Sequence, residues 1–200
     1  MKRAFTSAAS AATHSTALLV LLLLTACGSA PTLIRQTLDP LTSVTVTSSA
    51  TPFVFYRDNP ARAAYARNYL HLGPIEVNRS GSYSYYLWIG VWSTMQTPDA
   101  IEQRDTLESV ILFADGEPLS LELAGWSAEA IGGSEHIYVR PVADAIDAYY
   151  RVTADQIRLL AAATDLRLRT TGPAPRDYEP WDEQRAARRS LDAFLEKALF

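Results

Sequence analysis

The sequence predicts an α+β domain, an antiparallel, β-rich sheet or sandwich with two late helices packed on it. Two observations lead to this prediction. Short segments of alternating or continuous apolar residues run through most of the chain, whereas two segments near its end carry apolar residues at helical spacing. A chain that places strands first and helices last is typical of α+β domains.

Residues 83–94 (YSYYLWIGVWST) are the strongest predicted strand. One of its faces holds Tyr85, Leu87, Ile89 and Val91, and the other holds Tyr86, Trp88, Gly90 and Trp92. Both faces are apolar, which indicates either a central strand covered on two sides or a strand with an exposed aromatic face. The earlier segments predicted as strands, from their β-branched and aromatic residues, are 41–47, 52–57 and 69–78.

Five shorter features lie in the middle of the chain. Residues 59–67 are compatible with one or two helical turns, and residues 98–104 with a short helix or a loop. Asp115-Gly116 lies between two apolar runs and predicts a hairpin, because glycine tolerates the positive φ that such a turn needs. Residues 137–142 are a possible further strand, and residues 125–134 are expected to form a loop.

The last fifty residues change character. Thr153 and Gln156 fit a capping box, which predicts a helix running to about Ala163. An amphipathic strand over 166–169 and a proline-rich loop over 172–180 follow. Residues 180–183 are typical of a helix start, because a proline comes early and acidic residues lie in the first turn. An apolar stripe at helical spacing follows and predicts a second helix: Ala187, Leu191, Phe194, Leu195 and Ala198.

The first thirty residues differ from the rest. Lys2 and Arg3 give a positive start, and residues 17–24 (ALLVLLLL) are an unbroken apolar run. A run of eight is too short for a membrane span, which needs about 20 apolar residues. It has the length of the apolar region of a signal peptide.

The segment Leu24-Thr25-Ala26-Cys27 resembles the lipobox of bacterial lipoprotein precursors. In that class the chain is cut before the cysteine, which is then acylated. The resemblance implies a signal peptide over 1–26, an acylated cysteine and tether over 27–40, and a single periplasmic domain over 41–200. Gly28 follows the cysteine, where an aspartate often retains such proteins at the inner membrane, so the periplasmic face of the outer membrane is expected. An ordinary signal peptide with a stray cysteine is the alternative.

Charge and cysteine content exclude several classes of protein. Loss of Lys2 and Arg3 from the 18 basic residues leaves 16 against 22 acidic ones, a formal charge of −6. An acidic chain argues against nucleic acid as a partner, and it leaves lipid on Cys27 as the expected link to a membrane. Because Cys27 is the single cysteine, the acylated protein is expected to fold without disulfides.

Catalytic and cofactor motifs are weak in this sequence. Gly125-Trp126-Ser127 begins like a nucleophile elbow but lacks the second glycine. His136 with Asp144 or Asp147 could complete a triad with Ser127, but any chain of this length offers such trios. His71 and His136 are the only histidines of the mature chain, and they lack metal-ligand spacing. No metal and no cofactor is therefore expected, and a non-enzymatic role is favoured.

The aromatic face of residues 83–94 is the most suggestive candidate site. Tyr86, Trp88 and Trp92 would form a row of rings with a gap at Gly90, a platform on which sugar rings could stack. The competing interpretation, which is favoured, is that these rings are core. Five arginines near the end of the chain could form a site for an anionic partner: Arg167, Arg169, Arg185, Arg188 and Arg189. The favoured interpretation of these tail arginines is solvated faces with local pairs to acidic residues.

The segments YLHLGPIEVNR, SYYLWIGVWST and DGEP resemble uncharacterised lipoproteins of Gram-negative bacteria. That resemblance implies no activity and no catalytic residue. The function expected from the sequence is that of a lipid-anchored cell-envelope protein with a binding, structural or assembly role toward an envelope protein or glycan. A glycan-binding module using the aromatic strand face and a hydrolase of envelope material are the alternatives.

Overall fold

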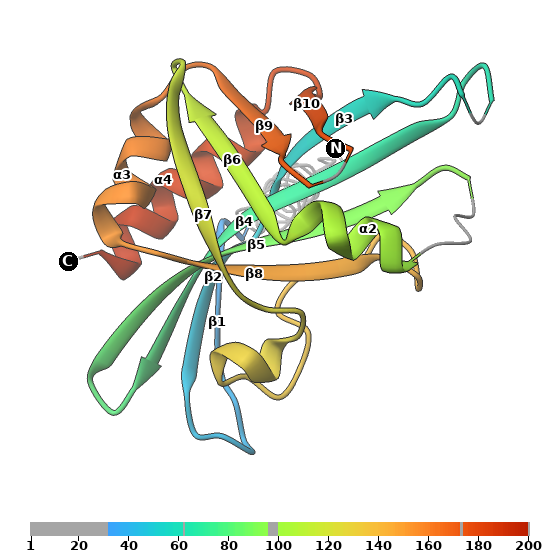
Figure 1. The fold of residues 1–200 in the computed structure, drawn as a ribbon. Helices are drawn as coiled ribbons and strands as arrows, with labels where there is room; N and C mark the ends of the chain where they lie inside the picture. Colours follow the sequence, from blue (N-terminus) through green and yellow to red (C-terminus); the bar gives the residue numbers. More distant parts are fainter. Residues whose placement is uncertain (1–31, 62, 96–99, 173, 200) are drawn as a thin grey trace, which may run out of the picture. The chain divides into compact units, whose positions relative to one another are not determined.

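Antiparallel strands close into an eight-stranded β-barrel, with two further strands beside it (Figure 1). The computed structural model describes residues 32–61, 63–95, 100–172 and 174–199. In this part of the chain the strands are β1 Ile34–Leu38, β2 Thr45–Ser49, β3 Phe53–Asp58, β4 Arg67–Arg79, β5 Ser82–Ser93, β6 Ser109–Ala114, β7 Glu117–Gly125, β8 Ile146–Val152, β9 Leu166–Thr170 and β10 Arg176–Pro180. The helices are α2 Ala100–Leu107, the 3₁₀ turn η1 Ala128–Ile131, α3 Ala154–Ala162 and α4 Arg185–Ala198.

The barrel closes through β5, which pairs with β4 along one edge and with β8 along the other. From β4 the wall continues through β3, β10, β9, β6 and β7 to β8. The long strand β4 carries two partners on its second edge, because Phe53–Asp58 pairs with its first half and β2 pairs with its second half. Strand β1 extends the sheet beyond β2.

The predicted α+β sheet or sandwich is therefore wrong. Periodicity identified the segments of β3, β4, β5, β6, β7 and β9, but it cannot show that β5 finds a partner on both edges. Closure also depends on strands that the sequence interpretation did not include. Strand β8 follows the segment 137–142, which forms no strand, and β10 lies in the predicted loop 172–180. Strand β1 lies within the predicted tether, and residues 59–61 and 63–66 form turns and irregular structure instead of a helix.

Other local predictions are confirmed. Asp115 and Gly116 have φ of 50° and 89° and form the β6–β7 turn. Thr153 and Gln156 form the reciprocal capping box that opens α3. Helix α4 begins later than expected, at Arg185, and buries Ala187, Leu191, Phe194 and Ala198 of the predicted stripe.

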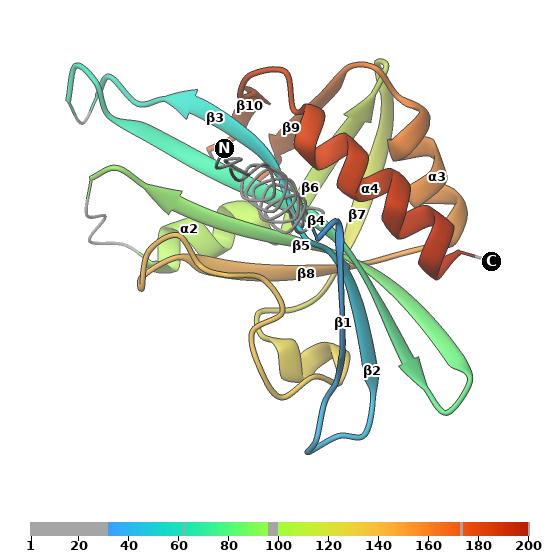
Figure 2. The same cartoon turned by 180° about the vertical axis from the view of Figure 1, so that it is seen from behind.

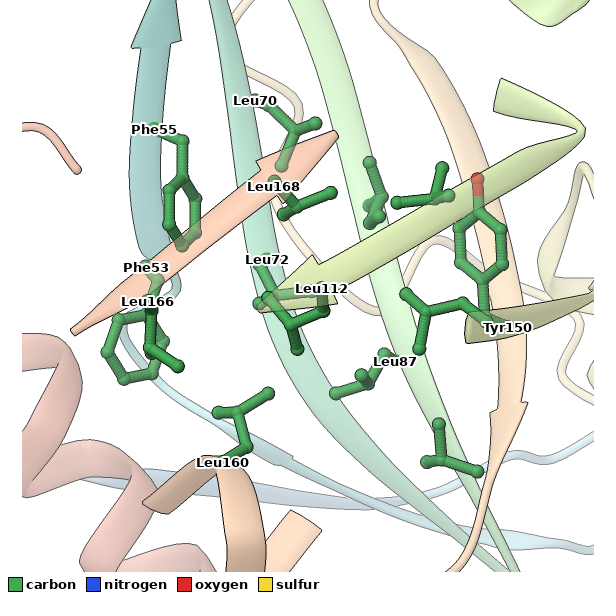
Figure 3. Close-up of a cluster of buried hydrophobic side chains, with 14 of the residues drawn as sticks. Phe53, Phe55, Leu70, Leu72, Leu87, Leu112, Tyr150, Leu160, Leu166 and Leu168 are labelled. Carbon is green, nitrogen blue, oxygen red and sulfur yellow. The ribbon is translucent and has the colours of Figure 1, made fainter. Parts of the chain in front are cut away.

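Apolar side chains fill the barrel interior, as the close-up in Figure 3 shows. An eight-stranded barrel is just wide enough for side chains to fill. Leu70, Leu72 and Leu112 have no exposed surface, and Tyr150 buries its ring and donates its hydroxyl to the Leu107 carbonyl. Helices α3 and α4 lie side by side (Figure 2) and add their apolar faces to the same core.

A second, smaller core covers part of the outer wall. The rings of Trp88 and Tyr138 stack at 4.5 Å between centroids, and the Trp88 indole donates to the buried Asp147 carboxylate at 3.1 Å. Two glycines make room for these rings, because a Cβ on Gly73 would lie 2.3 Å from Tyr138 and one on Gly90 would lie 2.3 Å from Trp88. The segment 126–145 is thereby fixed across strands β4, β5 and β8.

Substitution of Gly90 by alanine is expected to lower the free energy of unfolding by about 1–3 kcal/mol. The added methyl group meets an indole that Tyr138 and Asp147 hold in place, and overpacking of that kind costs energy of this order. Urea unfolding measures the change. Gly133→Ala is the matched control, since its Cβ would meet only ordinary contacts at 3.5 Å. Equal stability of the Gly90 and Gly133 variants would contradict this packing.

Candidate binding surface on the outer wall

The structure separates the three aromatic residues that the sequence singled out. Tyr86 and Trp88 are buried beneath the segment 126–145, with 5% and 1% of their surface exposed, so their faces are closed to a ligand. For these two residues the core interpretation is the one that the structure supports. Trp92, at the other end of β5, is only partly buried and lies in a different environment.

Trp92 belongs to a group of four aromatic side chains that we call the aromatic ledge: Tyr56, Tyr69, Trp92 and Trp181. The first three lie side by side on neighbouring strands, because Tyr56 of β3 is opposite Tyr69 of β4, and Tyr69 is opposite Trp92 of β5. Trp181 follows β10 and is held there by its backbone N–H, which donates to the Val54 carbonyl at 2.8 Å. Alternation along the strands directs these rings outward while Phe55 and Leu70 point into the barrel.

The rings of the aromatic ledge contact one another in sequence. Tyr69 stacks on Trp92 at 4.6 Å between centroids with an interplanar angle of 17°. Trp181 meets Tyr69 at 5.6 Å and Tyr56 at 5.2 Å, both edge to face. Such offset and T-shaped pairs fix ring orientation and add to the energy of burial. Trp181 remains 40% exposed, so the ledge is a preorganised aromatic surface in contact with solvent.

Arg67 lies across this surface. Its guanidinium carbon is 5.4 Å from the Tyr56 ring centroid and 5.2 Å from that of Trp181, within the range of cation–π attraction. Its Nε donates to the Asp58 carboxylate at 3.0 Å, and that hydrogen bond raises the pKa of Arg67 above its ordinary value. A paired donor and acceptor therefore border the rings.

His71 is the hydrogen-bond partner of Trp92 in the aromatic ledge. The Trp92 indole N–H donates to His71 Nε2 at 3.3 Å, which requires an unprotonated acceptor nitrogen. Burial lowers the pKa of His71 to about 4, so the imidazole is neutral at neutral pH and the hydrogen bond is retained.

A concavity of about 430 Å³ lies beside the ledge on the outer wall. Its walls carry two ion pairs, Arg167 with Asp165 at 3.1 Å and Arg169 with Asp177 at 2.6 Å. The remaining lining residues are Phe113, Gly116, Leu168, Tyr178 and Glu179. We call this concavity the charged groove.

The groove and ledge share a border. Glu179 of β10 lines the groove and pairs in register with Tyr56 of the ledge, and Trp181 comes two residues after Glu179. The ledge and groove are therefore continuous across β6, β9, β10, β3, β4 and β5.

The structure pairs two of the residues named for the hypothetical triad, because His136 Nδ1 lies 3.4 Å from Asp147. Ser127 has another partner, since its side chain hydrogen-bonds the Glu129 carboxylate and lowers the pKa of Glu129. Asp147 also accepts from Arg140 at 2.7 Å and from Trp88. These contacts bind the segment 126–145 to the wall. Within the described ranges, no group of three or more His, Cys, Asp or Glu side chains could hold a metal ion.

The tail arginines form local contacts. Arg167 and Arg169 pair with acids in the charged groove, and Arg185 pairs with Glu183. Arg188 donates to the carbonyls of Ala163 and Thr164 and so ties α4 to the end of α3. These pairs support the interpretation of solvated faces for these four residues, although two of them line the groove.

Comparisons with protein families, with curated protein sequences and with solved structures find no match for this chain. None of the helices in the described part of the chain has the length and apolar character needed to cross a membrane. Cys27 and the predicted signal peptide lie outside the described residues.

Sequence reasoning missed most of the ledge. Tyr69 and His71 alternate with the buried Leu70 and Leu72, so the outward face of β4 was visible in the sequence. The sequence predicts that Trp181 lies at the start of a helix, and no neighbouring residue indicates that it folds back beside Val54.

Acidification is expected to destabilise the fold partly through His71. Its folded pKa of about 4 lies below the unfolded value of 6.5, so the unfolded chain binds the proton first. The contribution of His71 is complete above pH 6.5 and is lost as the pH falls toward 4, which lowers the free energy of unfolding by about 2 kcal/mol between pH 7.0 and pH 4.5. Urea unfolding at pH 7.0, 5.5 and 4.5 measures it.

The variant His71→Gln provides the control for that pH dependence. Other carboxylates titrate in the same range, so the informative quantity is the difference between the wild-type and variant slopes. A variant with the full wild-type slope between pH 6.5 and 4.5 would show that His71 does not titrate as its environment indicates.

Proposed function

We propose that this protein is a lipid-anchored component of the bacterial cell envelope that binds an envelope glycan at the aromatic ledge and catalyses no reaction. The single observation that carries the binding role is the ledge itself. Its four rings are locked by mutual contacts, and Trp181 still presents 40% of its surface to solvent. Contiguous exposed aromatic surface is uncommon on soluble domains without a binding role.

A sugar is the ligand that this chemistry suits. Sugar rings present apolar C–H faces, which pack on aromatic rings, and hydroxyl groups, which need both donors and acceptors. The ledge offers rings beside the Arg67–Asp58 pair, which supplies a donor and an acceptor at its border. Arg67 is already paired, so the ledge is a poor site for a ligand that depends on a strong negative charge.

The packed barrel interior also supports a binding site on the outer wall. Its positions are occupied by side chains such as Leu70, Leu72 and Leu112, which have no exposed surface. Binding by the outer wall needs no opening of this core. A ligand that entered the barrel would have to displace tightly packed residues at a cost of several kcal/mol.

The membrane link of the proposal rests on residues 24–27 (LTAC) and the apolar run before them. Two or three acyl chains on Cys27 would hold the protein firmly, since each buried CH₂ contributes about 0.8 kcal/mol. Leu33 is hydrogen-bonded to the rest of the domain, because its carbonyl accepts from the Ala50 N–H and from the Ser190 hydroxyl. In the sequence, residues 28–32 separate the proposed anchor from Leu33.

Sedimentation with purified peptidoglycan tests the binding role. The mature protein in detergent is expected to be retained, and Trp181→Ala is expected to reduce the retained fraction at least fivefold, because it removes the exposed ring. Tyr83→Ala is the matched control, since Tyr83 is 55% exposed and lies at the far end of β5. Absence of retention, or equal loss in both variants, would contradict glycan binding by the ledge.

Substitution of Cys27 by serine tests the anchor. The wild-type protein is expected in the membrane fraction, with a mass that corresponds to cleavage before Cys27 plus acyl chains. The serine variant is expected to lose the acyl mass and most of its membrane association, because serine cannot form the thioether. Fractionation and mass spectrometry of the mature chain provide both readouts. Unchanged membrane association of the variant would refute the lipid anchor.

A further inference from the structure

The charged groove extends the aromatic ledge along the wall of the barrel. Glu179 lies in the groove and opposite Tyr56 in the β10–β3 ladder, so the two features meet at adjacent strands. Asp177, Glu179 and Trp181 alternate with the buried Tyr178 and share one outward side. A ligand longer than one ring that lies on the ledge would therefore reach the groove without a change in the fold.

The groove has the size and chemistry of a polar subsite. Its volume of about 430 Å³ falls within the range of roughly 300–1,000 Å³ that small-molecule sites occupy. Arg169 pairs with Asp177 at 2.6 Å and lies 5.7 Å from the Phe113 ring centroid, so its guanidinium is held by two neighbours. Cationic donors and anionic acceptors alternate around the groove. This arrangement suits a ligand with hydroxyl and amide groups better than a ligand with a concentrated charge.

We infer that the ledge and the groove form one extended site for a glycan chain of several sugars. One ring stacks on Trp181 and Tyr56, and the following units lie in the groove, where Arg169 donates and Glu179 accepts hydrogen bonds. The inference rests on the proposed function and adds the class of ligand: a linear oligosaccharide is bound along its length, and a single sugar is bound weakly.

A lipid bilayer is the competing occupant of an exposed aromatic surface. Tyr65 and Met95, at the ends of β3–β4 and β5, are 93% and 45% exposed and would favour an interfacial location. The groove argues against it, because a bilayer lying on the ledge would also cover the Arg169–Asp177 and Arg167–Asp165 pairs and desolvate them. A hydrated sugar chain leaves those groups with hydrogen-bonding partners.

Isothermal titration with a series of N-acetylglucosamine oligomers, from the dimer to the hexamer, tests the extended site. The dissociation constant of the mature protein is expected to fall at least tenfold between dimer and hexamer. Trp181→Ala is expected to weaken both ligands, because each needs the ledge. Arg169→Gln and Glu179→Gln are expected to weaken the hexamer at least fivefold and to weaken the dimer less, because the dimer places a single sugar in the groove.

Arg158→Gln is the matched control, since Arg158 forms a comparable exposed pair with Asp155 on α3, outside both surfaces. Equal affinity for dimer and hexamer, or a hexamer affinity unaffected by the two groove variants, would overturn the extended site. Neither result would contradict glycan binding by the ledge, which peptidoglycan sedimentation tests. Failure of every oligomer to bind would overturn the extended site as well. Trp181-dependent binding to phosphatidylethanolamine–phosphatidylglycerol vesicles by the Cys27→Ser protein, with no oligomer binding, would overturn it in favour of the bilayer.

Discussion

Strand β5 is the element on which the rest of the structure depends. It pairs along both edges, with β4 and with β8, and this double pairing turns a sheet into a barrel. It is also buried on both faces over its central residues, with Leu87 and Ile89 inside and Tyr86 and Trp88 outside. Gly90 is required between Trp88 and Trp92, because the Trp88 ring occupies the space of a Cβ.

Closure determines where function can reside. The interior of this eight-stranded barrel is filled by its own side chains, so our proposal places ligand binding on the outer wall. One part of that wall is covered by the segment 126–145, which stacks Tyr138 on Trp88 and pairs Arg140 with Asp147. The part around Trp92 carries the ledge, where the same kind of aromatic contact leaves Trp181 exposed. The two ends of one strand face thus serve packing and, in our proposal, binding.

The local structure was largely readable from the sequence. Alternation predicted the strands from β3 to β7, Asp115-Gly116 predicted the hairpin, and Thr153 with Gln156 predicted the start of α3. Each of these signals depends on neighbours in the chain.

Closure and the site were not readable, because both depend on distant partners. The β3–β10 junction joins residues such as Tyr56 and Glu179, and no periodicity indicates that pairing. Strand β10 begins just after the turn that follows β9, in a segment whose three prolines suggest a loop. For the same reason Tyr86, Trp88 and Trp92 could be placed on one strand face, but not divided into covered and open rings.

The most direct test of this account is a map of amide chemical-shift changes in the ¹⁵N-labelled protein on titration with the N-acetylglucosamine hexamer. We predict changes at Tyr56, Tyr69, Trp181 and Glu179, with the interior residues Leu72 and Leu112 unaffected. Shifts concentrated at the interior positions would contradict a site on the outer wall of a filled barrel.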